Sequence, residues 1–350
     1  MIDTIALTLD QSMFSISNHD AFSPSSKGLF FAPYTSFGAR RYAQCVNNPT
    51  SIDFARKIYK PRLTLTKRKI AMGNFSIRLK IEFSIPKLIF GNNFEEVENN
   101  HFDQIIETLQ TRLQEMSVWV EKENLVDAAV SSIHYGKNML LANYTSCSMV
   151  MSEIEKIDIT RRLDMNKTDY RNAGHCIRYH ANSYEVAFYD KIKDLAQSRT
   201  SEKRSIENYN SIQRDLFDFA DEKNLPEVLR MEVRLGSRQK IKSLLGSLDQ
   251  TPTLTFKNLF DAALSQSVLL HFWDVMAKDM AVLALAQQQP HEILQAFVDY
   301  GQGHSKLSKN LQLVGLMAVL HTVGWRGVKA IASDKASIRA LQRLKKDLES

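Results

Sequence analysis

One tyrosine of this chain, Tyr189, stands where an apolar run gives way to charged residues. Residues 184–189 have the composition of a β-strand, and residues 190–195, Asp-Lys-Ile-Lys-Asp-Leu, predict the start of a helix. A tyrosine can attack a phosphodiester covalently when a cation lowers its pKa and a metal ion holds the phosphate. The same pattern is also typical of a half-buried strand tyrosine followed by solvated charges. The stretch therefore indicates a nucleophile only if other segments supply acids, cations and metal ligands.

Four predicted strands carry polar side chains on the face that a half-exposed sheet would present to solvent. These strands fall near residues 75–85, 128–135, 185–189 and 229–235, and apolar residues occupy the alternate positions. If one antiparallel sheet aligns them, their polar faces converge. Their polar members are, in chain order, Lys80, Glu82 and Ser84, then His134, then Glu185 and Tyr189, then Arg230, Glu232 and Arg234.

This set of residue types can position a phosphodiester and polarise it. Two carboxylates and one imidazole, Glu82, Glu232 and His134, suit Mg²⁺ or Mn²⁺, and Mn²⁺ tolerates the imidazole better. Arg230 or Arg234 can bind non-bridging phosphate oxygens through two parallel hydrogen bonds. Lys191 can favour the phenolate of Tyr189. A glutamate between two arginines is also typical of an ion-pair ladder, and a histidine at a strand end is often simply a polar residue.

Two stretches are strongly basic. The final predicted helix carries Arg339, Arg343, Lys345 and Lys346, which is also typical of a solvated helix end. The run from residue 56 to residue 69 fits a solvated hairpin or a surface that binds DNA phosphates, whose contacts add salt-dependent affinity without sequence information. Its cations are Arg56, Lys57, Lys60, Arg62, Lys67, Arg68 and Lys69.

Composition indicates a soluble protein with an anionic partner. The 350 residues are 44% hydrophobic and 24% charged, and the net charge of +6 and pI of about 9.0 favour a polyanion. Three cysteines without metal-type spacing indicate a reducing compartment. The N-terminus lacks the pattern of a signal peptide, and the apolar runs at residues 281–286 and 311–320 are too short to span a bilayer. We expect a cytoplasmic protein that does not bind a membrane.

The order of predicted elements gives an α+β fold. A first strand at Ile2–Leu9 and the strands above form a central antiparallel sheet, flanked by helices near residues 93–123, 149–162 and 201–223. Residues 86–93, Pro-Lys-Leu-Ile-Phe-Gly-Asn-Asn, predict a turn. Beyond Gly246 only helical patterns occur. We therefore predict a first domain at residues 1–248, which carries the candidate site residues, and a mostly helical C-terminal domain at residues 254–350.

Five ordered segments of the first 235 residues resemble the gene II-type replication initiators of filamentous phages and related integrated elements. The segments are Met1-Ile-Asp3, Ser84-Ile-Pro-Lys-Leu-Ile-Phe-Gly-Asn-Asn93, Ile133-His-Tyr-Gly-Lys-Asn138, Val186-Ala-Phe-Tyr-Asp-Lys191 and Leu229-Arg-Met-Glu-Val-Arg-Leu235. The resemblance implies that Tyr189 is the nucleophile, Lys191 its accompanying cation and Glu232 the acid of the last strand. His134 stands where the filamentous phage protein has Asp. The His-apolar-His metal motif of many rolling-circle nickases does not occur in this sequence.

The function that the resemblance implies is a metal-dependent, site-specific endonuclease that nicks one DNA strand and later rejoins it. Tyr189 would form a 5′-phosphotyrosyl bond at an origin duplex, leave a 3′-hydroxyl for a host polymerase and circularise the displaced single strand. A host helicase would be a further partner. The storage of the phosphodiester energy in that bond would explain why no nucleotide-binding Gly-x-x-x-x-Gly-Lys-Ser/Thr motif occurs.

Three alternatives remain at this stage. A DNA-binding regulator or origin-binding protein without enzymatic activity could use the basic segment and the helical tail. A tyrosine recombinase could use His175, Arg178 and Tyr209, although the first two lie in a predicted hairpin rather than among helices. Within the nickase hypothesis, Tyr135 and Tyr184 are rival nucleophiles.

Overall fold

The structure is a computed structural model. It describes residues 1–31, 42–70, 74–142, 145–157, 164–171, 175–198, 226–250, 252–285, 289–300, 307–332 and 335–349. The chain divides into two compact units. The first unit contains residues 1–141 and 182–269, and the second contains residues 142–181 and 270–350. The helix predicted over residues 201–223 lies outside the described residues.

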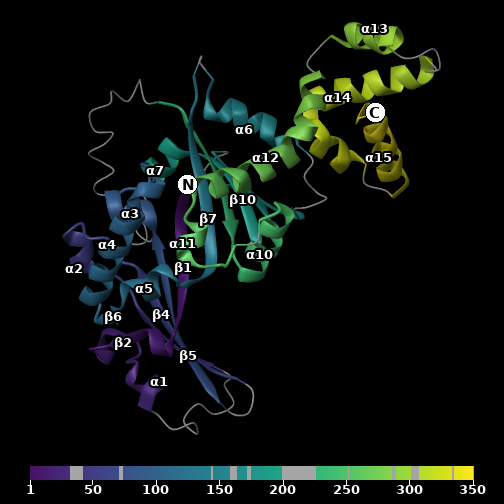
Figure 1. The fold of residues 1–350 in the computed structure, drawn as a ribbon. Helices are drawn as coiled ribbons and strands as arrows, with labels where there is room; N and C mark the ends of the chain where they lie inside the picture. Colours follow the sequence, from purple (N-terminus) through teal and green to yellow (C-terminus); the bar gives the residue numbers. More distant parts are fainter. Residues whose placement is uncertain are drawn as a thin grey trace. The chain divides into compact units, whose positions relative to one another are not determined.

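The first unit contains seven strands of an antiparallel sheet. Figure 1 shows these strands with helices around them. The order of the strands is β3-β4-β5-β1-β7-β11-β10, and every described pair among them is antiparallel. The central strand order does not follow the chain, because β1 lies between β5 and β7. The strands are β1 (Ile2–Asp10), β3 (Tyr42–Asn47), β4 (Arg62–Lys69), β5 (Phe75–Ser84), β7 (Ala129–Leu140), β10 (Tyr184–Asp190) and β11 (Val228–Leu235).

Short elements complete the first unit. A small second sheet pairs β2 (Phe14–Ile16) with β6 (Val118–Val120). Helices α3, α4 and α5 lie beside one another (Figure 1). The helices are α1 (Lys27–Phe31), α2 (Ser51–Ala55), α3 (Ile85–Phe90), α4 (Phe102–Glu115), α5 (Lys122–Val126), α7 (Lys191–Ser198), α10 (Arg238–Ser247) and α11 (Phe256–Leu259), with 3₁₀ turns η1 (Gln11–Met13), η2 (His19–Ala21) and η5 (Asn99–His101).

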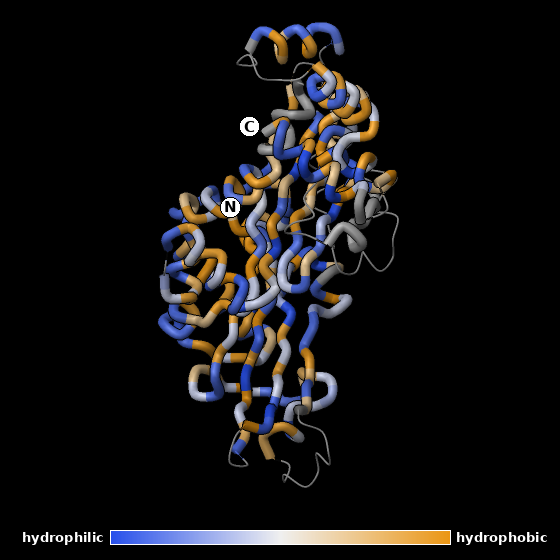
Figure 2. The backbone as a smooth tube through the Cα atoms, turned by 90° about the vertical axis from the view of Figure 1, so that its right-hand side faces the viewer, coloured by the Kyte–Doolittle hydropathy of each residue, from blue (hydrophilic) through white to orange (hydrophobic). Residues whose placement is uncertain are grey.

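Alternation of side chains gives the sheet one apolar and one polar face. Hydrophilic and hydrophobic residues alternate along the strands in Figure 2, as expected when successive side chains point to opposite sides. On the apolar face, Phe83 of β5 meets Phe256 of α11 edge to face, with ring centroids 6.1 Å apart. Helix α10 packs on β7 and β11 through Ile241 and Leu244, which are buried. The core therefore lies under this face.

The second unit is mostly helical. Its elements are α6 (Cys147–Glu155), the antiparallel pair β8 (Asp164–Arg171) and β9 (Cys176–His180), the greater part of α12 (Ala262–Leu285), α13 (Pro290–Tyr300), α14 (Leu307–Ile331) and α15 (Lys335–Glu349). Helix α14 bends at Gly324, whose φ is 64°. A side chain there would lie 2.2 Å from Cβ of Lys156, so only glycine fits. The next residue, Trp325, donates its backbone N–H to the carbonyl of Lys156.

The predicted fold class is confirmed, and several boundaries are close to those predicted. The α+β class, the central antiparallel sheet and the helical C-terminal region are all present. The turn predicted over residues 86–93 is wrong in part, because Ile85–Phe90 form a short helix that ends at Gly91 with a φ of 72°. The division into domains at residues 248–254 stays a prediction.

Helix α14 is long and apolar enough to cross a membrane, judged by length and composition alone. Core helices of soluble proteins pass the same test. The straight part before Gly324, residues 307–323, rises about 25 Å at 1.5 Å per residue, less than the ~30 Å hydrocarbon core of a bilayer. The absence of a membrane partner stays a prediction.

Leu79 of β5 tests the position of the core. Its side chain is 0% exposed, so Leu79→Ala should lower the free energy of unfolding by about 2–5 kcal/mol. Leu140→Ala, at a strand position that is 72% exposed, is the matched control and should change it by less than about 0.5 kcal/mol. Urea titration followed by circular dichroism measures both. Equal effects of the two substitutions would contradict the placement of the apolar face.

Candidate active site on the polar face of the sheet

The pairing of three strands gathers the predicted site residues on one face. Glu232 of β11 lies opposite Gly136 of β7, and Tyr189 of β10 lies opposite Arg230 of β11. Arg230 is in turn opposite Asn138 of β7. Directly opposed residues of antiparallel strands point to the same side, so these five residues share the polar face.

Tyr189 and Glu232 form a buried hydrogen bond at the centre of this face. The Tyr189 hydroxyl donates to Oε2 of Glu232 at 3.1 Å. Nδ1 of His134, from β7, lies 3.5 Å from Oε1 of the same carboxylate. Tyr189 is 7% exposed and Glu232 is 2% exposed. The structure thus brings together three residues that the sequence analysis placed at one site.

Arg234 holds the same carboxylate from the other side. Its Nε donates to Oε1 of Glu232 and its Nη2 to Oε2, both at 3.0 Å. Nη1 of Arg234 donates to Oε1 of Glu185 at 2.9 Å. Two residues of the same strand separated by one residue point to the same side, which allows this contact within β11. One guanidinium therefore bridges two carboxylates.

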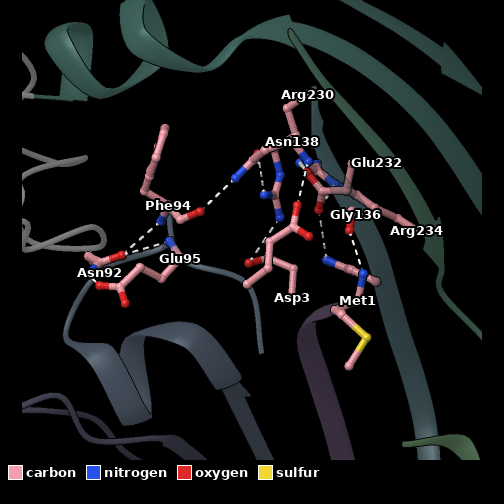
Figure 3. A network of polar contacts seen from close by, with 12 residues as sticks. Met1, Asp3, Asn92, Phe94, Glu95, Gly136, Asn138, Arg230, Glu232 and Arg234 are labelled. Carbon is pink, nitrogen blue, oxygen red and sulfur yellow. Dashed lines mark hydrogen bonds and ion pairs between the residues drawn. The ribbon is translucent and has the colours of Figure 1, made fainter. Parts of the chain in front are cut away.

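The guanidinium of Arg230 lies close to the backbone of β7 at Gly136 (Figure 3). A Cβ atom at Gly136 would be 2.7 Å from Nη2 of Arg230, so glycine is required for this close approach. Nη1 of Arg230 donates to Oδ1 of Asn138 at 2.9 Å, and Nη2 lies 3.3 Å from Oδ1 of Asp3. The position of Arg230 is thus fixed from three sides.

A loop after α3 supports this arrangement (Figure 3). Asn138 donates its side-chain amide to the carbonyl of Phe94 at 2.7 Å, and its backbone N–H to Oε1 of Glu96 at 2.7 Å. Asn92 accepts hydrogen bonds from the backbone N–H groups of Phe94 and Glu95, which shapes the loop. The loop therefore fixes Asn138, and Asn138 fixes Arg230.

Two polar atoms of the site, both buried, lack hydrogen-bond partners among the described residues. They are Nε of Arg230 and Oδ1 of Asp3, and Oδ1 of Asp3 has only its longer ion-pair contact with Nη2 of Arg230. A buried N–H without an acceptor costs free energy, and native proteins rarely leave one unless a ligand or water occupies the place. An anionic oxygen beside Arg230 would satisfy its Nε–H and be attracted by its charge.

Lys191, the first residue of α7, adds a second buried cation. Its side chain is 0% exposed, and its Nζ lies 5.8 Å from the centroid of the Tyr189 ring. Helix α7 packs against β10 and β11 and so brings this lysine into the polar layer. Burial lowers the pKa of Lys191 to about 7, and the charge of Arg230 contributes to the effect. Near neutral pH this amine can therefore give up or take a proton.

The surroundings keep Tyr189 protonated and Glu232 ionised. Burial raises the pKa of Tyr189 well above its usual value of 10, and the carboxylate of Glu232 adds to the effect. Burial alone would also raise the pKa of Glu232. The charge of Arg234, with hydrogen bonds from His134 and Arg234, outweighs burial and holds that pKa well below 4.5. At rest, a neutral phenol donates to an ionised carboxylate.

Several residues of this site were not given roles in the sequence analysis. Asp3, Gly136 and Asn138 lie within the segments that carry the gene II-type resemblance, but only strand pairing shows their contacts with Arg230. Lys87 of α3 is also buried, and burial lowers its pKa against the opposing charges of Asp3 and Asp194. A glycine inside a strand is the one signal in the sequence that could have indicated a close approach.

The third predicted metal ligand lies apart from the other two. Glu82 of β5 pairs in register with Ala6 of β1, and its Oε2 accepts from Nζ of Lys80 at 2.7 Å. Strand β1 separates it from His134, which is opposite Thr4. The ligand atoms of Glu82, His134 and Glu232 do not form a described cluster within 4.8 Å.

Glu232 in particular does not fit a metal ligand in this arrangement. Both of its carboxylate oxygens already accept hydrogen bonds from Arg234, and one also accepts from Tyr189. A guanidinium that neutralises a carboxylate competes with any metal ion for the same lone pairs. The Mg²⁺ or Mn²⁺ site stays a prediction, and no step below is derived through an ion.

The basic segment divides into structural and exposed cations. Nζ of Lys60 lies 2.7 Å from Oδ1 of Asp53 and is largely buried, so this lysine stabilises the fold. Nζ of Lys67 lies over the ring of Phe75. Arg62 and Arg68 on β4 are exposed, as are Arg56, Lys57 and Lys69. Binding of DNA by the segment stays a prediction.

The rival nucleophiles lie elsewhere. Tyr135 is fully buried on the apolar face, opposite Val233, and burial raises its pKa above the usual value. Tyr184 begins β10 and points to the side opposite Tyr189, with Nζ of Lys240 4.0 Å from its ring centroid. Tyr209 lies outside the described residues. Among the described candidates, Tyr189 alone contacts a carboxylate within the polar cluster.

No protein-family model, curated protein or solved structure matches this chain. The function proposed below is therefore inferred from the geometry of the polar face and from the resemblance described above.

The buried charge of Lys191 should have a measurable cost. Its pKa is lowered from 10.5 in the unfolded chain to about 7 in the folded protein, so below pH 7 the folded state holds a disfavoured ammonium group. Between pH 7 and 10.5 the unfolded state binds more protons, and stability rises with pH. Lys191→Met should raise the free energy of unfolding at pH 6 by on the order of 3–5 kcal/mol, with a gain that shrinks toward pH 10.

Urea titrations at several pH values measure this effect. Lys122→Met, at an exposed lysine of α5, is the control and should show no comparable pH-dependent gain. A loss of stability in Lys191→Met at pH 6 would contradict the account of Lys191 as a net destabilising charge.

Proposed function

We propose that this chain is a site-specific DNA endonuclease and strand-transferase of the rolling-circle type, with Tyr189 as its nucleophile. The observation that supports the proposal best is the Tyr189–Glu232 hydrogen bond among Arg230, Arg234 and Lys191. The site joins a nucleophilic oxygen, a proton acceptor and cations for a phosphate. The resemblance to gene II-type initiators agrees with this proposal.

The chemistry follows from these positions. The Tyr189 oxygen attacks the phosphorus, the bond from phosphorus to the 3′ oxygen breaks, and the 3′ oxygen leaves with a proton as a hydroxyl group. The phenolic proton passes to a group of the site, and one proton passes from the site to the leaving 3′ oxygen, so the number of protons is unchanged. In the reverse step a 3′-hydroxyl attacks the 5′-phosphotyrosyl bond, and Tyr189 recovers its proton. No nucleotide cofactor is consumed because the covalent bond keeps the energy of the phosphodiester.

Arrival of a phosphate would change the protonation balance of the site. At rest Arg234 holds Glu232 so firmly that the carboxylate is a weak base. A phosphate that binds Arg234 would compete for its donors and make Glu232 more basic. Lys191, with a pKa of about 7, is a second acceptor for the phenolic proton. Activation of Tyr189 would therefore depend on bound DNA.

Arg230 and Arg234 take different parts in this proposal. Arg230 has an unsatisfied Nε–H and a fixed orientation, so it would hold one non-bridging oxygen in place. Arg234 is 26% exposed and bridges two carboxylates, so it can exchange one of them for a phosphate. The same proposal includes the partners and the location of the protein. The partners are the origin duplex, the displaced single strand, a host polymerase and a host helicase. The location is the cytoplasm of a bacterial host.

A second candidate is a DNA-binding regulator without enzymatic activity. The observation that favours it is the state of Tyr189, which is 7% exposed and protonated at rest. Exposed cations such as Arg62 and Arg68 would then be the main contacts with DNA. This candidate predicts binding that falls steeply with salt and no covalent product.

Tyr189→Phe tests the nucleophile. The wild type, incubated with supercoiled plasmid that carries the DNA flanking its own gene, should give nicked circles with covalently bound protein. Tyr189→Phe removes only the attacking oxygen and should reduce the adduct below detection, while DNA binding stays within about twofold. Tyr184→Phe, on the opposite face of the same strand, is the matched control and should retain the adduct.

Denaturing gels and mass mapping of the DNA-linked peptide measure the outcome. An adduct in Tyr189→Phe, or one mapped to another tyrosine, would sink the assignment. Binding without any adduct in the wild type, with and without added metal ions, would favour the regulator.

The same assay tests whether formation of the covalent adduct requires a divalent metal ion. In the prediction from the sequence, the adduct forms with Mg²⁺ or Mn²⁺ and is lost in EDTA. His134→Ala should then raise the metal concentration needed for half-maximal adduct about tenfold or more. An adduct that EDTA leaves undiminished would show instead that the arginines and Lys191 supply the positive charge.

A further inference from the structure

One face of α15 carries three cations that the proposed active site does not use. Arg339, Arg343 and Lys346 are exposed, and none has an ion-pair partner among the described residues. At about 100° per residue they lie within roughly 60° of one another around the helix. The spacing of four and three residues therefore makes a continuous basic stripe.

The opposite face of α15 packs within the second unit. Ile338, Leu341, Leu344 and Leu348 are half-buried and centred about 180° from the stripe. Nζ of Lys345 lies 4.8 Å from the ring centroid of Trp325 in α14, and Lys309 of α14 forms an ion pair with Asp347. The helix is thus held in one rotation, which directs the stripe away from α14.

We propose that this stripe, formed by Arg339, Arg343 and Lys346, binds the phosphate backbone of duplex DNA. This inference rests on the proposed function for the identity of its partner. Charge complementarity supports it. The three cations have no ion-pair partner within the described part of the chain and no carboxylate between them in the sequence, so they match a polyanion. An anionic membrane fits less well, since a membrane-surface helix inserts its apolar face, and here that face packs toward α14.

The dimensions of the stripe set the size of the effect. Arg339 and Lys346 are seven residues apart, about 10.5 Å along the axis at 1.5 Å per residue. One DNA strand places about three phosphates in that length at 3.4 Å each. Three neutralised phosphates contribute a slope of about −2.7 to the dependence of log affinity on log salt. The contacts carry no base information and would add affinity at any sequence.

The experiment compares two triple variants of the full chain on a 20-base-pair duplex of mixed sequence. The stripe variant is R339Q/R343Q/K346Q. The control variant, R238Q/K242Q/K257Q, removes the same charge from exposed positions of α10 and α11. Fluorescence anisotropy between 50 and 200 mM NaCl gives the salt slope of each protein.

The stripe variant should have a slope shallower by about 2.7, so the wild type should lose about 40-fold more affinity over this range. The control variant should keep the slope of the wild type. Equal slopes for all three proteins would overturn the inference, as would a stripe variant that loses binding only to vesicles of anionic lipid or to an acidic polypeptide. Circular dichroism with an unchanged α-helical signal excludes unfolding of α15 as the cause.

Failure of this inference and failure of the proposed function are distinguishable. The stripe variant keeps Tyr189 and its neighbours, so it should still form a covalent adduct with a single-stranded oligonucleotide that the wild type cleaves. Suppose that neither the wild type nor a variant forms an adduct, but the salt slope of the stripe variant is shallower. That result would support the DNA-binding stripe and contradict the proposed nickase activity. If the adduct forms and the salt slopes of all three proteins are equal, the nickase activity is supported and the DNA-binding stripe is contradicted.

Discussion

The ion pair between Glu232 and Arg234 is the contact on which the polar face depends. A carboxylate that is 2% exposed cannot remain ionised without a cation, because the cost of removing a charge from water is several kcal/mol. Arg234 offsets that cost with two hydrogen bonds, and it reaches Glu232 because both residues point to the same side of β11. The charge of Glu232 then attracts the hydroxyl of Tyr189 and the imidazole of His134. Without Arg234 the carboxylate would be driven to take up a proton, and the orientation of Tyr189 would no longer be specified.

The contact that makes this site stable also keeps it unreactive. A hydrogen bond to an ionised, low-pKa carboxylate fixes the phenol but does not remove its proton, and burial raises the pKa of the phenol further. A phenolate at this position would be repelled by the carboxylate of Glu232, to which the hydroxyl now donates. The arrangement therefore suits a nucleophile that must stay protonated until a phosphate reorganises the arginines. Lys191 lies beside the ring of Tyr189, and no salt bridge to another described residue holds its pKa high, so burial can lower that pKa.

Sequence patterns predicted the faces of the strands but not the order of the strands. Apolar and polar residue types alternate in β5 and β11, so Glu232 could be placed on a polar face before any pairing was known, and Tyr189 follows from the strand positions of β10. The sequence did not show that this polar face is itself buried at β11. The metal set required β5 and β7 to be neighbours, and β1 lies between them. No local pattern encodes that order, since it depends on contacts between segments distant in the chain. The turn at Pro86 and Gly91 had a similar ambiguity. Proline and glycine indicate a turn, but proline at the start and glycine at the end of a segment also indicate a short helix. The structure has such a short helix, α3, at this place.

The two arginines of β11 illustrate how similar residues acquire different mobility from their surroundings. Arg230 is 3% exposed, lies against Gly136, and contacts Asn138 and Asp3, so any rotation would break several contacts. Arg234 is more exposed and bridges Glu185 and Glu232. It can therefore exchange one carboxylate for a competing anion while it keeps its ion pair with the other. A phosphate entering between them would meet one rigid donor and one adaptable donor. In the proposed reaction, the first would position the phosphate and the second would release Glu232, and both arginines lie on the same side of β11.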